Sequence, residues 1–174
     1  QIVNHGDQEK QGYQQAGWDW NRMPGATTIH LPLTELDSPK PHTLMLRGER
    51  GFNGVSALQN RYGAMAFDLQ SPADLERFDP KFSAKKSVLA TDNHLIMLGS
   101  EIRSSDKKNP VETTLFQLAI TPQLNAVWIN GQKVEQFPYQ TSLKSGDWLI
   151  DSDGNGYLIT GAEKIGRASC RERV

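Results

Sequence analysis

The sequence has little sulfur chemistry and no long apolar run. Cys170 is the single cysteine among 174 residues, so the chain cannot form a disulfide framework of its own. No stretch of about 18 or more apolar residues occurs, and no basic segment precedes an apolar one at the start, so the sequence predicts neither a membrane span nor a signal peptide. Because the chain opens with Gln1 rather than methionine, we expect any export signal to lie further upstream.

Stretches of helical period are almost absent as well. From about Thr27 onward, short β-branched and aromatic runs alternate with turn residues, a pattern typical of an all-β protein. A composition of 37% hydrophobic and 22% charged residues suits a soluble globular domain, and no linker or repeat divides the chain. The predicted strands are Thr27–Leu33, Thr43–Leu46, Tyr62–Leu69, Ala84–Ala90, His94–Ser100, Glu112–Ile120, Ala126–Ile129, Trp148–Asp151 and Tyr157–Thr160.

The turn residues predict how these strands pair. Asp92-Asn93, Asn130-Gly131 and the run Asp153–Gly156 contain residues that tolerate positive φ, which tight hairpins require. Adjacent strands are therefore expected to pair antiparallel. Ser71–Phe78 could form one or two helical turns, since Ser71 can cap a helix and Pro72 suits its first position. With no other helix to cover a sheet, we expect a sandwich of two antiparallel sheets.

The last ten residues, 165–174, differ in character from everything before them. They contain three arginines and the only cysteine, and the string IGRASCRERV resembles the translation of a common sequencing adapter. We therefore interpret 165–174 as non-native read-through, with a genuine basic tail as the alternative. Without them, Lys and Arg fall from 19 to 16, Asp and Glu fall from 20 to 19, and the net charge changes from −1 to −3. Cys170 is then no candidate nucleophile.

Several motifs together resemble one known enzyme family. They lie in colinear order over nearly all of residues 1–164 and are GWDWNRMPGATTIHLPL (17–33), LDSPKPHTLMLRGERGF (36–52), AKKSVLATDNHLI (84–96), VETTLFQLAITP (111–122) and GDWLIDSDGNGYLIT (146–160). On these motifs the sequence is similar to polysaccharide lyase family 8, in its chondroitin-cleaving branch. Residues 1–164 would then form part of the central antiparallel β-sandwich domain of such an enzyme.

The resemblance implies an exported bacterial lyase, secreted or periplasmic. Such an enzyme cleaves chondroitin and dermatan sulfate, and often hyaluronan, by β-elimination, leaving an unsaturated uronate. It needs no metal or organic cofactor for that step. The implied partners are sulfated glycosaminoglycan and the missing α-helical and C-terminal β-domains of the same enzyme, not nucleic acid or a membrane. The alternative is a non-catalytic carbohydrate-binding or structural β-sandwich module.

The catalytic residues that the resemblance implies are missing from this chain. In the family, a His and a Tyr lie in a motif like HEGNYPGYSF, an Arg in one like GRHPF, and a Glu in one like WSSEIYN. None of these strings occurs here, and the Glu motif is expected to lie just upstream of Gln1. We therefore assign no catalytic residue and expect this chain alone to be inactive.

The strongest candidate binding site is the segment that contains Trp18, Trp20, Asn21 and Arg22. Aromatic faces stack on sugar rings, an amide both donates and accepts hydrogen bonds, and Arg pairs with carboxylate or sulfate, which are the groups of an acidic glycan. The following Pro24-Gly25 predicts a turn, which would place the segment on a loop. The alternative is that the tryptophans belong to the core and that Asp19 orients Arg22.

Other polar groups are interpreted as structural. Glu49, between two arginines in RGERGF, predicts an ion pair in a turn rather than a role in a cleft, and Asp151–Gly156 predicts a hairpin turn rather than a calcium loop. The four histidines lie on different predicted elements and show no metal-ligand spacing; they are His5, His30, His42 and His94. The lysines near positions 40, 85–86 and 107–108 predict solvated strand edges and turns rather than a nucleic-acid surface.

Overall fold

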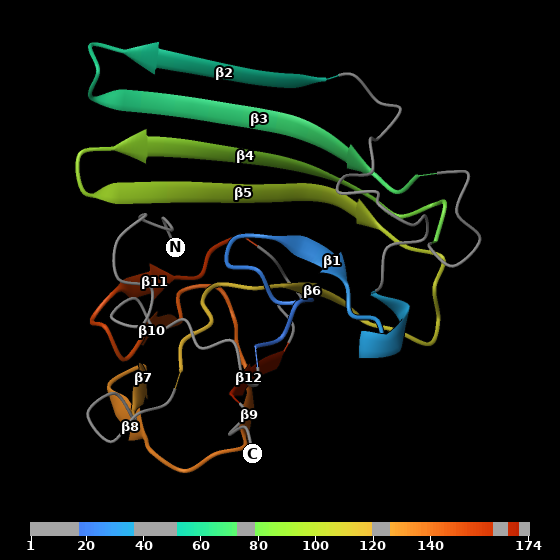
Figure 1. Cartoon of the computed structure of the whole chain (residues 1–174). Helices are drawn as coiled ribbons and strands as arrows, with labels where there is room; N and C mark the ends of the chain where they lie inside the picture. Colours follow the sequence, from blue (N-terminus) through green and yellow to red (C-terminus); the bar gives the residue numbers. More distant parts are fainter. Residues whose placement is uncertain (1–17, 37–51, 73–78, 120–125, 162–166, 171–174) are drawn as a thin grey trace. The chain divides into compact units, whose positions relative to one another are not determined.

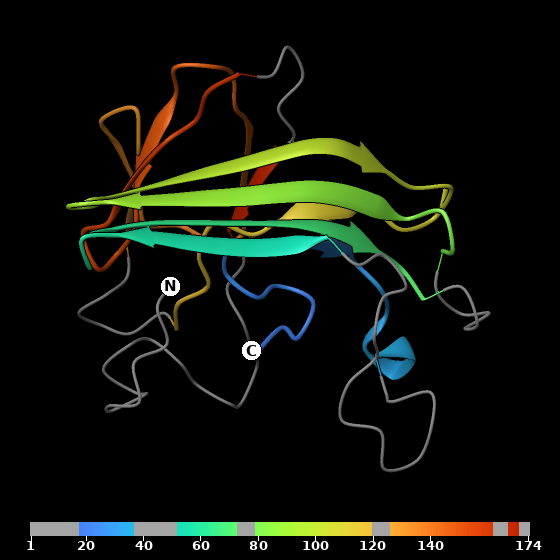
Figure 2. The ribbon, with the colours of Figure 1, turned by 90° about the horizontal axis from the view of Figure 1, so that it is seen from above.

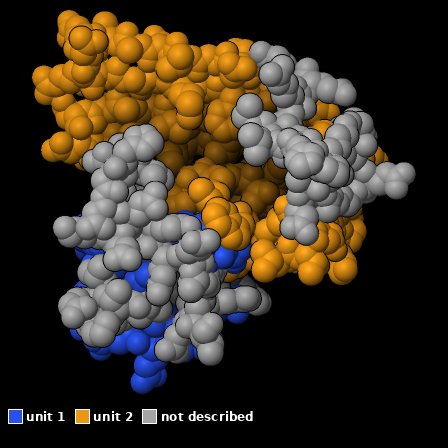
Figure 3. Space-filling model, in the orientation of Figure 1, with its two compact units in different colours: residues 1–19, 114–174 blue, residues 20–113 orange. Residues whose placement is uncertain are grey.

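The computed structural model describes residues 18–36, 52–72, 79–119, 126–161 and 167–170. Its contacts divide the chain into two compact units, coloured in Figure 3: unit 1 comprises Gln1–Asp19 and Thr114–Val174, and unit 2 comprises residues 20–113. Apart from one 3₁₀ turn, η2 (Leu33–Glu35), every regular element among the described residues is a strand, and each pairing between them is antiparallel. The predicted all-β antiparallel sandwich class is confirmed.

Unit 2 is built on a four-stranded meander that runs across the view in Figures 1 and 2. Its strands follow the chain order and are β2 (Asn53–Leu58), β3 (Tyr62–Gln70), β4 (Ser83–Thr91) and β5 (His94–Arg103). The predicted strands at β3, β4 and β5 are confirmed, as is the hairpin turn at Asp92-Asn93. Strand β2 was not predicted, because its sequence NGVSAL contains few β-branched or aromatic residues.

A short two-stranded sheet faces one side of this meander. It pairs β1 (Thr27–Ile29) with β6 (Val111–Thr113). Because side chains alternate along a strand, Thr27 and Ile29 are buried while Thr28 between them is only half-buried. Ile29 packs with Leu31 and Phe82 in the core of unit 2, and Leu69 of β3 packs against them.

A buried lysine joins the two sheets of unit 2. Lys86 of β4 is 7% exposed, and its Nζ donates a hydrogen bond of 2.8 Å to Oγ1 of Thr27. The hydroxyls of Thr27 and Thr113 lie 2.9 Å apart across the β1–β6 pair. Burial of the ammonium lowers the pKa of Lys86, since a charged amine is poorly solvated between sheets.

Unit 1 contains a second four-stranded sheet, in the order β11-β10-β7-β8. Its strands are β7 (Val127–Ile129), β8 (Gln132–Val134), β10 (Trp148–Ile150) and β11 (Gly156–Leu158). Alternate residues of these strands, together with Leu143 from the segment between β8 and β10, build an apolar core in which the buried side chains are Val127, Ile129, Val134, Leu143 and Leu149. This core lies on one face of the sheet, because the strands alternate buried and exposed positions.

The predicted turns of unit 1 are confirmed. Asn130 and Gly131, between β7 and β8, have φ of +50° and +83°, the left-handed region that a tight hairpin requires. In the β10–β11 hairpin, the buried Asp151 carboxylate accepts hydrogen bonds from the amides of Asp153 and Asn155 and from the hydroxyl of Tyr157. These contacts make Asp151–Gly156 a hairpin turn, as predicted.

Two strands were predicted too long, and two short ones in unit 1 were missed. The predicted strand Thr27–Leu33 ends at Ile29, and Leu33 begins a 3₁₀ turn instead. The predicted strand Glu112–Ile120 ends at Thr113, and the next apolar residues, Leu115 and Phe116, pack instead against the core of unit 1. The missed strands, β8 and β9 (Tyr139–Ser142), have only three and four residues, too few for an alternating pattern to stand out.

Some predictions fall outside the described residues or remain predictions. Thr43–Leu46 and most of the possible helix at Ser71–Phe78 lie outside the described ranges. Strand β12 (Arg167–Cys170) pairs with β9. Such pairing uses backbone groups that any sequence supplies, so the interpretation of 165–174 as read-through stays a prediction. Among the described residues, no helix is long and apolar enough to cross a membrane.

Candidate functional site

A group of charged side chains in unit 2 lies on the β1–β6 pair. Thr28 stands directly opposite Glu112 in the register, so the two side chains share one face of this small sheet. His30 follows β1 by one residue and its amide donates to the carbonyl of Pro110, which keeps His30 on the face of Thr28. The opposite face, with Ile29 and Thr27, is buried. The strand period therefore separates a polar face from an apolar one.

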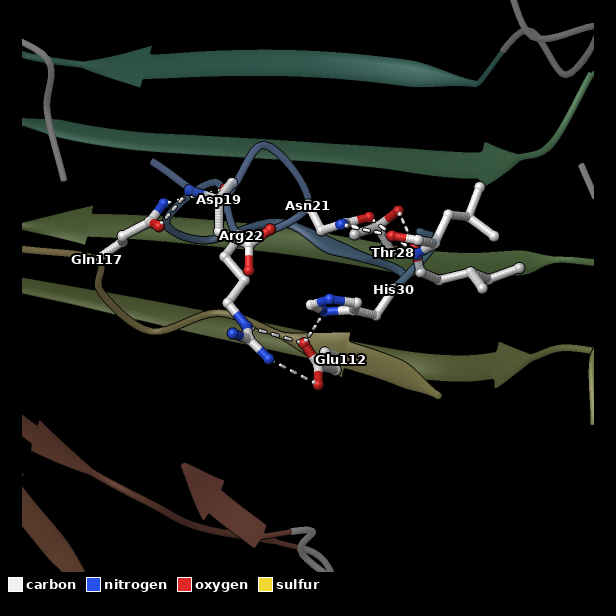
Figure 4. A network of polar contacts seen from close by, with 9 residues as sticks. Asp19, Asn21, Arg22, Thr28, His30, Glu112 and Gln117 are labelled. Carbon is white, nitrogen blue, oxygen red and sulfur yellow. Dashed lines mark hydrogen bonds and ion pairs between the residues drawn. The ribbon is translucent and has the colours of Figure 1, made fainter. Parts of the chain in front are cut away.

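Glu112 is the centre of this group, as Figure 4 shows. One carboxylate oxygen, Oε2, lies 3.1 Å from Nε of Arg22 and 2.8 Å from Nδ1 of His30, and Oε1 lies 3.2 Å from Nη2 of Arg22. Arg22 thus grips the carboxylate with two parallel hydrogen bonds, the strongest geometry for such a pair. We call Arg22, His30 and Glu112 the Glu112 cluster.

The electrostatics of the Glu112 cluster favour the ionised carboxylate. Burial alone would raise the pKa of Glu112, but the hydrogen bonds from Arg22 and His30 outweigh it and lower this pKa. Since an ionised carboxylate only accepts hydrogen bonds, Nδ1 of His30 must carry the hydrogen that it donates. The second ring nitrogen, Nε2, is then the acceptor of a neutral His30. A carboxylate that orients an imidazole in this way is chemically able to support a base.

Asn21 fixes the loop that carries Arg22. Its side-chain amide Nδ2 donates 2.9 Å to the carbonyl of Leu31, and its Oδ1 accepts a hydrogen bond of 3.0 Å from the amide of Leu31. The side chain therefore replaces a strand partner for the chain just after β1, and it is buried, with 7% of the residue exposed. Because these bonds pin residue 21, the neighbouring Arg22 is held over β6.

The four predicted binding residues have different surroundings. Trp20 is 52% exposed, whereas Asn21 is buried and its side-chain amide is hydrogen-bonded to the backbone of Leu31. Arg22 is held by Glu112, and Trp18 is half-buried in unit 1. Nothing in these surroundings tests glycan binding, which stays a prediction. Of these four residues, Trp20 is the most exposed.

Within unit 1, the side chain of Gln117 holds the backbone of Asp19. Its Oε1 accepts from the amide of Asp19 at 2.9 Å, and its Nε2 donates to the carbonyl of Asp19 at 3.2 Å (Figure 4). This amide pairs with a backbone segment just as Asn21 pairs with Leu31. In each unit, then, one side-chain amide binds the backbone of a distant residue, at Asp19 in unit 1 and at Leu31 in unit 2.

Sequence reasoning missed Glu112 as the partner of Arg22 and His30. No local pattern indicates it, because 90 residues separate Glu112 from Arg22 and the contact depends on the β1–β6 register. Of the other candidates, Glu49, His5 and His42 lie outside the described residues. The described ranges contain no group of three or more His, Cys, Asp or Glu side chains that could hold a metal ion.

The sequence model of polysaccharide lyase family 8, super-sandwich domain, matches residues 2–172. The chain belongs to polysaccharide lyase family 8. This match spans both units, so the residues of the Glu112 cluster lie within the matched region.

Curated relatives agree with the membership of family 8. Over 95% of its length the chain is 74% identical to the chondroitin sulfate ABC endolyase of Proteus vulgaris. It is 40% identical over 91% of its length to the chondroitin sulfate ABC exolyase of the same organism, and 30% identical over 88% to that of Bacteroides thetaiotaomicron. The chain spans only 16%, 16% and 15% of the lengths of these three proteins.

Proposed function

We propose that this chain is part of the super-sandwich of an exported lyase that cleaves chondroitin and dermatan sulfate by β-elimination, with hyaluronan as a further candidate substrate. The observation that carries the proposal is the 74% identity, over 95% of the chain, to a chondroitin sulfate ABC endolyase. A secreted or periplasmic location is part of the proposal and follows from the nature of a polymeric substrate.

The chain contributes framework to this enzyme, and the catalytic groups come from elsewhere in it. None of the strings that resemble the family's catalytic motifs occurs here. The Glu112 cluster is charge-compensated: its carboxylate is gripped by Arg22 and its histidine is turned toward the carboxylate. Such a group is suited to fixing the Trp20 loop on the β1–β6 sheet. A positioning role for the cluster is therefore favoured over a role as base.

Trp20 is our proposed sugar contact in this chain. Its exposed indole precedes Asn21, which is pinned by Leu31, and Arg22, which is pinned by Glu112. A ring on a loop that is held at two successive residues loses little freedom when a sugar stacks on it. The same loop without these anchors would pay a larger entropic cost on binding.

Further parts of the same enzyme are the proposed partners of unit 2. Strands β2 and β5 are exposed along their whole length and carry large apolar side chains, among them Val55 at 85%, Leu95 at 51% and Met97 at 40% exposure. Val55 and Met97 lie on the face of the meander that is directed toward β1–β6. In register, Val55 pairs with Met65, Met65 with Val88 and Val88 with Met97. Val88 is two residues from Lys86, which donates a hydrogen bond to Thr27 of β1 and so marks this face. Apolar sheet surface of this kind is normally covered by another layer.

The test compares a full-length enzyme that carries this sequence with the 174-residue chain. Each is incubated with chondroitin sulfate, dermatan sulfate and hyaluronan, and the ultraviolet absorbance of the unsaturated uronate is followed. We expect a rise with the full-length enzyme and none with the chain alone. A full-length enzyme that produces no unsaturated product would overturn the proposed reaction. A sustained rise with the chain alone would show that His30 or another group here acts as the base.

A further inference from the structure

A basic hollow lies at one end of the four-stranded meander in unit 2. Its volume is about 440 Å³, and its lining includes Lys81, Arg103, Ser83, Ser104, Ser105 and Gln70. Three of these residues end or begin a strand, since β3 ends at Gln70, β4 begins at Ser83 and β5 ends at Arg103. In register, Ser83 stands opposite both Gln70 and Arg103, so the three side chains share one face of the sheet. We call this place the Arg103 hollow.

A β-bulge puts Arg103 on that face. Between two successive paired positions, β4 advances from Ser83 to Lys85 while β5 advances from Ser100 to Arg103, so β5 carries one extra residue. Within that step Glu101 has φ of +50°, a conformation that a regular strand does not contain. Without the extra residue, Arg103 would point to the opposite side of the sheet, because side chains alternate with a period of two. The bulge therefore re-aims a guanidinium into the hollow.

Asp79 fastens the two loops that complete the hollow. Its carboxylate accepts hydrogen bonds from the amide of Lys81 at 2.9 Å and from the hydroxyl of Ser104 at 2.8 Å, and also from the amide and hydroxyl of Ser105. Burial opposes its ionisation, but these bonds together outweigh burial and hold the pKa of Asp79 far below its usual range. Asp79 does not line the hollow itself. The walls are thus preorganised by a carboxylate that is saturated with donors.

The charges around the hollow favour an anion. Among the described residues, neither the Lys81 ammonium nor the Arg103 guanidinium makes a hydrogen bond or ion pair, although Arg103 helps to lower the pKa of Glu101. Glu101 is itself paired with Lys85 at 2.6 Å. Two cations and the hydroxyl of Ser83 therefore face a concave surface, while the hydroxyls of Ser104 and Ser105 already donate to Asp79. Guanidinium, ammonium and hydroxyl donors are the groups that bind sulfate and carboxylate.

We propose that the Arg103 hollow is a binding site for an acidic group of a polysaccharide, a sulfate ester or a uronate carboxylate, held by Lys81, Arg103 and the hydroxyl of Ser83. The proposal rests on the proposed function for its ligand class. It adds a site that shares no residue with the Glu112 cluster. An enzyme with a second anchor for its polymer holds the chain near the reacting bond between successive cleavages.

The test is a titration of the isotope-labelled 174-residue chain, followed by amide chemical shifts. The probes are a sulfated chondroitin tetrasaccharide, its desulfated counterpart and inorganic sulfate. We expect saturable shifts at Lys81, Arg103 and Ser104, and a dissociation constant that rises about tenfold for each of Lys81→Gln and Arg103→Gln. The matched control for the double variant, Lys81→Gln with Arg103→Gln, is Lys107→Gln with Lys108→Gln, which removes the same two charges from residues that do not line the hollow. Dispersed amide spectra confirm that each variant is folded.

Each outcome decides one question. Binding that the double variant loses and the control keeps supports the site, and the sulfated and desulfated arms show whether sulfate or uronate is the group held. No saturable shift at the hollow, or equal losses in the variant and the control, overturns it. Arg103→Lys keeps the charge without the planar fork, so an intermediate loss supports paired contacts. A full-length enzyme that cleaves normally while this titration fails overturns the hollow alone, whereas binding without cleavage overturns the proposed reaction alone.

Discussion

His30 and Glu112, 82 residues apart in the sequence, meet with Nδ1 of the histidine 2.8 Å from Oε2 of the carboxylate. The contact closes a long loop, and it is possible only because β1 and β6 pair in one register. The same carboxylate receives Arg22 from the loop that precedes β1. Glu112 therefore connects three segments of unit 2, and its replacement should destabilise the contacts among all three.

We predict that Glu112→Gln lowers the free energy of unfolding of the chain by about 2 kcal/mol, since a half-buried carboxylate loses charge-assisted bonds from Arg22 and His30. Urea unfolding at neutral pH measures it. Glu135→Gln is the matched control, because its pair with Lys133 is exposed and worth under about 1 kcal/mol. Equal losses in the two variants would contradict the importance of the Glu112 cluster.

The Glu112 cluster also predicts an acid dependence of stability. In the folded protein the pKa of Glu112 lies below its ordinary value of 4.5, because Arg22 and His30 outweigh the effect of burial. The unfolded chain therefore binds the proton first as the pH falls. The stabilisation is complete above pH 4.5 and is lost as the pH falls through the folded pKa. Unfolding measured from pH 7 to pH 3 should show a steeper acid loss in the native chain than in Glu112→Gln.

Sequence patterns predicted local structure well and long-range contacts poorly. The β4–β5 hairpin was predicted because β-branched and apolar runs flank Asp92-Asn93, and both signals are local. Strand β2 was missed, since its six residues are exposed and its conformation is imposed by pairing with β3. Trp20 and Arg22 attracted attention through their residue types alone. That Arg22 is gripped by Glu112 depends on a register that no sequence period encodes.

We predict that Asn21→Ala destabilises the chain by about 2 kcal/mol. The variant leaves the amide and carbonyl of Leu31 without the two hydrogen bonds that the buried Asn21 side chain supplies. Thermal unfolding measures the loss, and Asn53→Ala is the control because Asn53 is an exposed residue of β2. A variant with unchanged stability would show that water replaces the side chain at Leu31.

We predict that Trp20→Ala weakens the binding of chondroitin sulfate oligosaccharide to the chain at least tenfold and changes its stability by less than about 0.5 kcal/mol. The reason is that half of the indole is exposed, so it contributes little to the core. Calorimetric titration measures the binding, with Leu33→Ala as a control for loss of an exposed apolar side chain of 70% exposure. Unchanged affinity would remove Trp20 from the proposed glycan contact.

Lys86 provides a prediction of the opposite sign. Its ammonium is buried between the two sheets of unit 2, and Thr27 accepts its hydrogen bond. Lys86→Met should raise the free energy of unfolding at pH 7 by about 1 kcal/mol, because the thioether fills the space without a desolvated charge. Thr27 keeps a partner in the variant, since its hydroxyl lies 2.9 Å from that of Thr113. Urea unfolding measures the gain.

The pH dependence of Lys86 gives a second measurement of the same residue. Burial puts its folded pKa below the ordinary 10.5, so on raising the pH the folded protein loses this proton before the unfolded chain does. Stability should therefore rise between the folded pKa and pH 10.5 in the native chain, and Lys86→Met should lack this rise. Lys85→Met is the control, because Lys85 is the adjacent lysine and is exposed and paired with Glu101. The Lys85→Met variant should therefore show the same rise in stability as the native chain. A loss of stability in Lys86→Met at every pH would mean that the ammonium is better compensated than burial and one hydroxyl allow.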